Sequence, residues 1–529
     1  MAKIHKWYKL MVDVEIRYKD EATCYIVTDE VTMYNLKDRM KFHPKNYFFS
    51  PKYKARVWDG YVKLIKNNTM PSGLIPKLCE VIKSFNSTFS IDSRYLQKFN
   101  ITRDFVKQYA EILNLTNDNG ENIQLREHQL EGVYKAISNK RMTGLSATNS
   151  GKSALIYVYI RFLLDVVKLK QILLLVPTTT LVEQMYSDFY SYSLKNEWSV
   201  ETNCQKVYSN IKNRDLQKPV IISTWQSIYN NDVSFFENFE GFICDEVHLA
   251  KGDSIQSIAS KCINASYRLG VTGSLSDCYV DELVIRGAFG SVVQLINNEQ
   301  MIQKGYSTPY DVKCILLKYD DEISKHMKYL NYHDEIDFIS ECKDRRKYIA
   351  KLVNNLKNNT LVLFEKIDKQ GIPIYQLLKA ALPDKKVLYI DGEIKIENRI
   401  KIIEYMKNHN DVVLIASYGT FSTGINLRNL YNLIFATPFR SKIRLLQSLG
   451  RMLRTFENKD KVMIYDLVDD MSYKSYVNDL LKQFTESRLV YYDRENSNYK
   501  IYKVNLGKVE NEDFYIEKAE EIKKSKKMA

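Results

Sequence analysis

The chain has 529 residues, 45% of them hydrophobic and 27% charged, and this length predicts three or four domains. Its net charge of +13 favours a polyanionic partner, because Lys and Arg release counterions from phosphates, although a solubility charge or a compositional bias gives the same sign. Eight scattered cysteines, an N-terminus without signal-peptide shape and the lack of a long apolar run predict a reduced cytoplasmic protein with no zinc site and no membrane span.

Residues 1–118 are expected to form a small basic α/β (α+β) domain that binds nucleic acid. The first 120 residues hold 20 Lys and Arg against 13 Asp and Glu, and Lys37–Lys66 interleaves basic with aromatic residues. Within it, Asp59-Gly60 predicts the turn of a hairpin over Val57–Val62. Such mixtures suit phosphate contact with base stacking, but the aromatic rings can equally form a core beneath a basic surface. We favour a core role for the rings and nucleic-acid contact for the basic set, namely Lys45, Lys52, Lys54 and Arg56.

From Gln124 the pattern changes to short apolar runs that alternate with helical stretches, which is typical of a parallel sheet covered on both faces. The first series comprises Ile172–Val176, Val220–Ser223, Phe242–Cys244 and Leu269–Thr272; the second comprises Asp311–Leu317, Leu361–Phe364, Val387–Ile390, Val412–Ala416, Leu433–Ala436 and Val462–Tyr465. We therefore expect two tandem α/β domains, 119–306 and 307–482, followed by a C-terminal extension, 483–529.

A phosphate-binding loop is predicted at 146–153, between an apolar run that ends near Leu145 and a strongly apolar helix. Backbone N–H groups at a helix N-terminus attract phosphate, Lys152 can reach the outer phosphates, and the Ser153 hydroxyl can ligate Mg²⁺. The strict pattern has Gly where Ser146 stands. The expected nucleotide-binding residues of the loop are Thr148, Asn149, Ser150, Gly151, Lys152 and Ser153.

A pair of carboxylates, Asp245 and Glu246, follows the apolar run 241–244. A carboxylate at the carboxyl end of a parallel strand faces the same crevice as a phosphate loop in that sheet. Asp245 is expected to hold Mg²⁺, and Glu246 to position and deprotonate the attacking water.

Together with the phosphate loop, the Asp-Glu-x-His sequence at 245–248 resembles superfamily 2 helicases. The resemblance implies two RecA-like domains and places Gln129 against the adenine of ATP. It assigns nucleic-acid contact to two further segments and makes Thr272-Gly-Ser274 the link between hydrolysis and domain movement. The residues expected to contact nucleic acid are Pro177, Thr178, Thr179, Thr224, Trp225 and Gln226.

Two motifs of the second α/β domain extend this resemblance. The segment 417–426 resembles a motif that touches nucleotide through Gly424 and nucleic acid through Ser417 and Tyr418, although Asn426 stands where many relatives have Asp. The segment 447–454 resembles the arginine-finger motif. Gln447, Arg451 and Arg454 are spaced four and three apart, which predicts one helix face, and the two arginines are expected to stabilise charge on the γ-phosphate.

The order of these motifs behind a basic domain with a Trp58-Asp-Gly60 turn is similar to a family of recombination and repair helicases from T-even-type bacteriophages. The resemblance implies a monomeric, ATP- and Mg²⁺-dependent DNA helicase in the host cell cytoplasm. Its substrates would be branched DNA, by junction branch migration and fork regression, and RNA–DNA hybrid in R-loops. A duplex translocase that separates no strands, an RNA helicase and a nucleic-acid-binding scaffold with an inactive ATP site remain alternatives.

Overall fold

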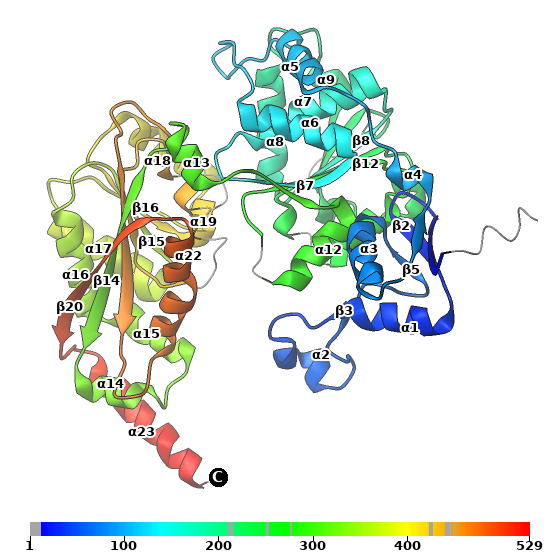
Figure 1. Ribbon diagram of the computed structural model, residues 1–529. Helices are drawn as coiled ribbons and strands as arrows, with labels where there is room; N and C mark the ends of the chain where they lie inside the picture. Colours follow the sequence, from blue (N-terminus) through cyan, green and yellow to red (C-terminus); the bar gives the residue numbers. More distant parts are fainter. Residues whose placement is uncertain are drawn as a thin grey trace, which may run out of the picture. The chain divides into compact units, whose positions relative to one another are not determined.

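The computed structural model describes residues 12–209, 215–249, 253–275, 278–422, 427–439, 445, 448–450 and 452–528 (Figure 1). The chain divides into two compact units that meet in sequence at Asn297 and Asn298. Within the described ranges, no helix combines the length and apolar character that a membrane crossing needs.

The first unit begins with a four-stranded sheet in the order β5-β2-β1-β6. Alternate residues of its central strand, Val14 and Ile16, are buried against helices α1 and α3, and the Asp29 side chain caps α1 by accepting from the backbone N–H groups of Val31 and Thr32. The elements are β1 (Val14–Tyr18), β2 (Thr23–Val27), α1 (Glu30–Arg39), β5 (Thr69–Pro71), α3 (Ile75–Ser84) and β6 (Phe89–Ile91).

The basic aromatic segment corrects two expectations. Strands β3 (Lys41–Phe42) and β4 (Val62–Lys63) pair antiparallel and enclose residues 43–61, with η2 (Tyr47–Phe49) and α2 (Pro51–Lys54), so the hairpin predicted over 57–62 is wrong. A core role is also wrong for Phe48 and Phe49, which are 48% and 64% exposed, whereas Phe42 packs against the core of the small domain as expected. The two-residue ladder leaves this insert outside the larger sheet, so its rings pack mainly on one another.

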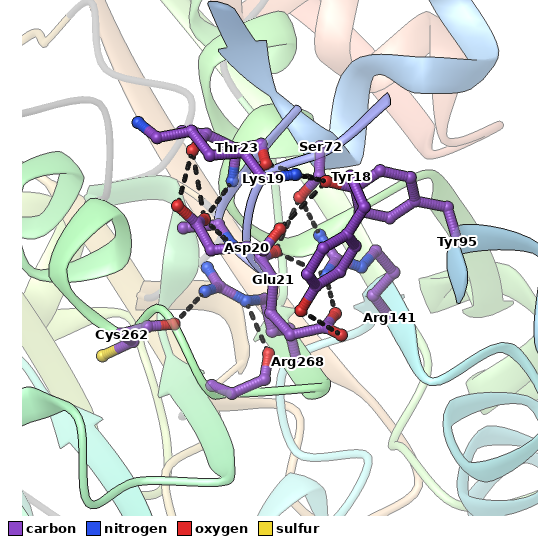
Figure 2. Close-up of polar contacts among 12 residues, drawn as sticks. Tyr18, Lys19, Asp20, Glu21, Thr23, Ser72, Tyr95, Arg141, Cys262 and Arg268 are labelled. Atoms are coloured by element: carbon purple, nitrogen blue, oxygen red, sulfur yellow. Dashed lines mark hydrogen bonds and ion pairs between the residues drawn. The ribbon is translucent and has the colours of Figure 1, made fainter. Parts of the chain in front are cut away.

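The small sheet is fastened to the remainder of its unit by a polar network (Figure 2). The Arg141 guanidinium donates to the Ser72 hydroxyl at 2.7 Å and to the backbone oxygen of Glu21 at 2.7 Å, and lies 3.1 Å from the Glu21 carboxylate. The Glu21 N–H donates to the Ile263 oxygen at 2.9 Å. A Cβ on Gly73 would lie 2.1 Å from the Arg286 oxygen, so only glycine permits this close approach of helix α12 (Tyr279–Phe289).

The described part of the first unit also contains a seven-stranded, all-parallel sheet in the order β13-β7-β12-β11-β8-β10-β9. The predicted strands are confirmed, and β8, β10, β11 and β12 are buried along their whole length. The strands are β7 (Arg141–Ser146), β8 (Ile172–Val176), β9 (Cys204–Val207), β10 (Val220–Thr224), β11 (Gly241–Asp245), β12 (Tyr267–Thr272) and β13 (Val292–Ile296).

Helices cover this sheet. Residues 154–162 of α7 are all buried, as the apolar run predicts, and α7 packs between α6 and α8. The principal helices are α5 (Arg103–Ile112), α6 (Glu127–Asn139), α7 (Lys152–Phe162), α8 (Thr179–Tyr192) and α11 (Asp253–Lys261), with the shorter α4 (Ser93–Leu96), α9 (Val200–Asn203) and α10 (Val233–Phe236).

The second unit holds another seven-stranded parallel sheet within its described residues, in the order β16-β17-β15-β18-β19-β14-β20. The six predicted strands are present, and β20 from the segment 483–529 adds an edge beside β14. The strands are β14 (Tyr310–Tyr319), β15 (Thr360–Phe364), β16 (Val387–Ile390), β17 (Val413–Ser417), β18 (Asn432–Phe435), β19 (Val462–Asp470) and β20 (Asn498–Gly507).

Two buried ion pairs tie this sheet to its helices. The Arg345 guanidinium of α16 lies 2.8 Å from the Asp469 carboxylate of β19, and Arg488 lies 2.8 Å from Asp466 of the same strand. The helices whose bounds are described in this unit are α13 (Asn298–Gln303), α14 (Asp321–Met327), α15 (Tyr332–Glu341), α16 (Lys343–Asn354), α17 (Ile372–Ala381), α18 (Ile396–Asn408), α19 (Tyr418–Ser422), α21 (Asp479–Gln483), α22 (Val490–Arg494) and α23 (Glu512–Met528).

Candidate nucleotide and nucleic-acid sites

The carboxyl edge of the first unit's large sheet carries most of the predicted site residues, in two groups. The neighbouring strands β7, β12 and β11 end in the phosphate loop, in Thr272-Gly-Ser274 and in Asp245-Glu246. The next strands, β8 and β10, end at Pro177–Thr179 and at Trp225-Gln226. Strand order thus gathers the expected nucleotide residues at one half of the edge and the expected nucleic-acid residues at the other.

The phosphate loop runs from the end of β7 to the start of α7. Asn149 and Gly151 have φ angles of 68° and 79°, and such left-handed residues turn the chain tightly enough to form an anion-binding concavity. Ser146, where the strict pattern has Gly, lies in the strand, and its hydroxyl is 2.7 Å from that of Ser150. The substitution therefore adds a hydrogen bond across the loop.

The residues before the loop brace its backbone. The Gln129 amide donates to the oxygens of Ser150 at 3.1 Å and Gly151 at 2.9 Å, and His128 Nε2 lies 2.9 Å from the Ser150 oxygen. A Cβ on Gly151 would lie 2.3 Å from Gln129 Nε2, so this contact requires glycine. Gln129, expected against adenine, thus supports the loop.

The Asp-Glu-x-His segment is joined to the Thr-Gly-Ser segment by hydrogen bonds. His248 Nδ1 lies 2.9 Å from the Thr272 hydroxyl and 3.2 Å from the Glu246 carboxylate, and the Thr272 hydroxyl lies 3.3 Å from that same carboxylate. The Thr272 hydroxyl also donates to the Ser274 oxygen at 2.9 Å. Hydrogen bonds therefore link the Glu246 carboxylate directly to the segment that follows β12.

The surroundings shift the pKa values of the two carboxylates in opposite directions. Burial and the charge of Glu246 raise the pKa of Asp245 above its ordinary value. Burial also disfavours the charge of Glu246, but the Lys152 ammonium and His248 outweigh this effect and hold its pKa below the ordinary value. Glu246 is consequently the more readily ionised of the two carboxylates, which suits a proton acceptor.

The donor set suits a magnesium ion. Ser153 offers a hydroxyl, 2.8 Å from the Tyr192 hydroxyl, and Asp245 offers a buried carboxylate beside a second acid. Hard oxygen ligands from one or two side chains, with phosphates and waters, are the usual Mg²⁺ environment. Across the described residues, no cluster of three His, Cys, Asp or Glu forms a protein-only metal cage.

A cavity of about 440 Å³ lies at the second half of the edge and is lined by Pro177, Thr178, Thr179, Ser209, Thr224, Gln226 and Ser227. Five of these are predicted nucleic-acid contacts. Small hydroxyl side chains and turn backbone are typical partners of phosphate oxygens. Trp225 is packed, partly buried, against the core beneath this surface.

The second unit has a cavity of about 480 Å³ at the end of β17, where Ser417, Tyr418, Gly419 and Thr420 meet Glu365 and Arg399. The Ser417 hydroxyl donates to the Thr420 hydroxyl at 2.9 Å. Tyr418 is only 4% exposed and donates to the Thr437 oxygen at 2.8 Å, so its ring supports the loop. Gly424 and Asn426 lie outside the described residues.

Of the arginine motif, Gln447 and Arg451 lie outside the described residues, whereas Arg454 follows the last helical residue, Met452. The predicted shared helix face is therefore wrong for Arg454. The buried Lys459 ammonium donates to the oxygens of Met452, Arg454 and Arg428, the last at 2.9 Å, so it fastens the end of this helix. Thr308 also donates to the Arg454 oxygen, at 3.3 Å.

Sequence reasoning did not identify several of these supporting residues. His128, Tyr192 and Lys459 each contact a predicted motif residue from a distant or unremarked position. The sequence offered one signal for them, namely that His128 directly precedes the predicted nucleotide residue Gln129.

Family models match three successive parts of the chain. They are described as DNA helicase UvsW, N-terminal, at residues 13–92; type III restriction enzyme, res subunit, at 122–277; and helicase conserved C-terminal domain, at 344–456.

The matches to individual proteins cover about two thirds of this chain or more. The ATP-dependent DNA helicase uvsW of Enterobacteria phage T4 is 30% identical over 512 residues, which cover 94% of this chain and 100% of that protein. A putative helicase 22 of Sulfolobus islandicus filamentous virus is 24% identical over 66% of this chain and 65% of its own. The crystal structure of T4 UvsW matches with a TM-score of 0.50 at 29% identity, covering 93% of this chain and 100% of that chain.

These matches confirm the predicted architecture of two tandem RecA-like domains behind a small basic α/β domain, and with it a nucleic-acid-dependent ATPase. The chain belongs to the UvsW family of ATP-dependent helicases.

Proposed function

We propose that this helicase acts on branched DNA, by migrating junctions, regressing forks and unwinding RNA from R-loops during recombination, repair and replication. The observation that carries the proposal is the match to a phage DNA helicase over nearly the whole of both chains, including the basic N-terminal region. The chain would work as a monomer.

In the ATP site, we assign phosphate binding to the backbone of residues 148–151 and to Lys152. Glu246 positions the attacking water and accepts its proton, and the Lys152 ammonium and His248 keep its carboxylate ionised for this role. Gln129 fixes the loop, and contact with adenine would add to that support. Arg451 and Arg454 would stabilise charge on the transferred phosphoryl group, and Gly424 would contact the nucleotide.

Ser153 and Asp245 would hold Mg²⁺, which neutralises charge on the phosphates when bound. Asp245 is suited to this task because it is buried at the end of a rigid strand. The backbone N–H of Glu246 donates to the Asp245 carboxylate at 2.9 Å and orients it.

DNA would follow the hydroxyl-rich cavity beyond β8 and β10 and the loop at Ser417 and Tyr418, held mainly through phosphates. Residues 1–118 would form a nucleic-acid-binding domain that adds grip through Lys45, Lys52, Lys54 and Arg56. The motor domains would occupy 119–306 and 307–482, with 483–529 as an extension. Low sequence specificity is expected from such contacts.

Duplex translocation without strand separation and RNA unwinding are the competing functions. A strand-release assay with ATP separates them, using a labelled replication fork, a matched RNA duplex and a triplex-displacement substrate. Release of the fork strand supports branched-DNA unwinding, whereas triplex displacement alone indicates a translocase and RNA release alone indicates an RNA helicase.

The ATP site is tested with Lys152→Ala and Glu246→Gln. The first should abolish hydrolysis, and the second should bind ATP and DNA without turnover, because it keeps the side-chain shape but loses the proton acceptor. Lys170→Ala is the matched control, since that exposed lysine precedes β8 at the opposite edge of the sheet. Normal turnover in Lys152→Ala would remove the basis of the assignment.

A further inference from the structure

The insert between β3 and β4, residues 43–61, presents an aromatic pair to solvent. Phe48 and Phe49 lie 4.5 Å apart between ring centroids and are 48% and 64% exposed. In Figure 1 the insert, marked by α2, stands out from the body of its unit and is joined to it at β3. Exposing two neighbouring large rings to water costs free energy, which binding of a ligand to the rings would recover.

The pair stands on a rigid support. The His43 ring stacks between Tyr47 and Tyr61, at centroid distances of 3.9 and 3.8 Å, and Tyr47 meets Tyr53 at 4.9 Å. A Cβ on Gly60 would lie 2.6 Å from the Tyr47 ring, so glycine with a φ of 83° lets the backbone pass directly against this stack. The backbone that carries the exposed rings is therefore held in place, so little backbone entropy is lost when a ligand binds them.

The charges around the pair are unbalanced. Lys41 and Lys63 at the base of the insert are paired with Asp38 and Asp59, each at 2.6 Å. For Lys45, Lys52, Lys54 and Arg56, by contrast, no carboxylate of the described chain lies within ion-pair distance. The Lys54 ammonium lies 5.8 Å from the Phe49 ring centroid, so cations and aromatic surface occupy the same patch.

We propose that Phe48 and Phe49 form a stacking platform for unpaired nucleotides of branched DNA. The proposal rests on the proposed function. An unpaired strand supplies both things that this patch lacks: π faces for the two rings and phosphates for the four cations. A paired duplex supplies phosphates but hides the faces of its bases, and an acidic peptide supplies charge without a planar apolar face.

The attachment of the insert gives the platform a role in the motor. The small sheet is fixed to the phosphate-loop body through Arg141, Glu21 and Gly73. A nucleotide held on the platform is consequently held at a constant place relative to that body. At a branch, this would keep a displaced base from pairing again.

The test measures binding of the full chain to two labelled DNAs, a fork with an unpaired gap at the branch and a linear blunt duplex. Replacing both rings, Phe48→Ala with Phe49→Ala, should raise the Kd for the gapped fork about fivefold to a hundredfold, the usual range for loss of one stacked base. The Kd for the duplex should stay within about twofold, and the salt dependence should be unchanged, because no phosphate contact is lost. A 2-aminopurine base in the gap should be quenched by the wild type and not by the variant.

Two further variants separate stacking from folding. Val57→Ala is the matched control, because Val57 is an apolar, 79% exposed residue of the same insert without a ring, and it should bind both DNAs as the wild type does. Phe48→Trp with Phe49→Trp should keep tight binding and quenching, since indole rings also stack. If Trp variants bind as weakly as Ala variants, the ring faces are not the binding element.

Three results would overturn the proposal. They are unchanged fork affinity in the Ala variant, an equal loss on fork and duplex, and a wild type that self-associates through these rings in sedimentation. Strand release from the same fork is scored separately. A wild type that binds and quenches the gap but releases no strand refutes the branched-DNA helicase and leaves the platform standing.

Discussion

Removal of the Arg141 side chain tests whether the small sheet and the phosphate-loop body form one rigid unit. Arg141→Met keeps the aliphatic volume but deletes the donors to Ser72 and to the Glu21 oxygen, and the ion pair with the Glu21 carboxylate. Breaking a fully buried pair costs about 3–5 kcal/mol. Because the two side chains keep 17% and 22% exposure, we expect about 2–3 kcal/mol here.

The assay is hydrogen exchange at the Glu21 amide, whose N–H donates across the junction to the Ile263 oxygen at 2.9 Å. A loss of 2–3 kcal/mol corresponds to roughly 30- to 150-fold less protection at that amide. Arg17→Met is the matched control, because Arg17 forms a 2.6 Å pair with Glu15 on the same sheet but is 59% exposed. Its removal should change protection by less than about threefold.

Unchanged protection of the Glu21 amide in Arg141→Met would refute this reasoning. An equal loss in Arg17→Met would refute it as well, because the effect would then follow from a change in charge and not from the junction.

Three other predictions concern stability and grip. Asp469→Asn should destabilise the second unit by about 3–5 kcal/mol in urea unfolding, because Arg345 then keeps a buried charge without its partner, whereas the Arg345→Met, Asp469→Leu pair should recover most of that loss. Burial lowers the pKa of Lys459 to about 7 in the folded chain, against about 10.4 in the unfolded chain. Between these two pH values the unfolded chain binds more protons than the folded chain, so the free energy of unfolding should rise with pH by up to about 1.4 kcal/mol per pH unit. Lys459→Met should remove this rise, and an unchanged slope of the urea midpoint between pH 7 and 9 would contradict it. Replacing Lys45, Lys52, Lys54 and Arg56 together by Ala should reduce the magnitude of the slope of log K against log salt for duplex DNA by about three to four. A slope equal to that of the wild type would show that these residues touch no phosphates.

In the two large sheets the central strands could be predicted from the sequence, whereas three of the four edge strands could not; the edge strand β16 was predicted. Strands β8, β10 and β11 are covered on both faces, so they are continuous apolar runs. In these sheets β9, β13 and β20 were missed, and each lies at an edge; the short strands of the small N-terminal sheet were also missed. Strand β20 is largely exposed, so neither an apolar run nor alternation marks it.

The local geometry of the motifs was predictable, while contacts between distant segments were not. In a loop that leads from a strand into a helix, the backbone N–H groups at the helix N-terminus point toward the loop. Strand order then brings Asp245 to the same edge of the sheet. By contrast, Ser153 meets Tyr192 and Glu246 meets Thr272 only because separate elements pack together. The rings of the insert were misassigned because composition does not distinguish a core from a cluster that packs on itself.

The most direct test of the central claim is strand release from a labelled four-way junction and a labelled R-loop, with ATP and Mg²⁺, by the wild type and by Glu246→Gln. The account predicts that the wild type resolves both substrates and that the variant binds both but resolves neither. ATP consumption by the wild type without strand release from either substrate would contradict it.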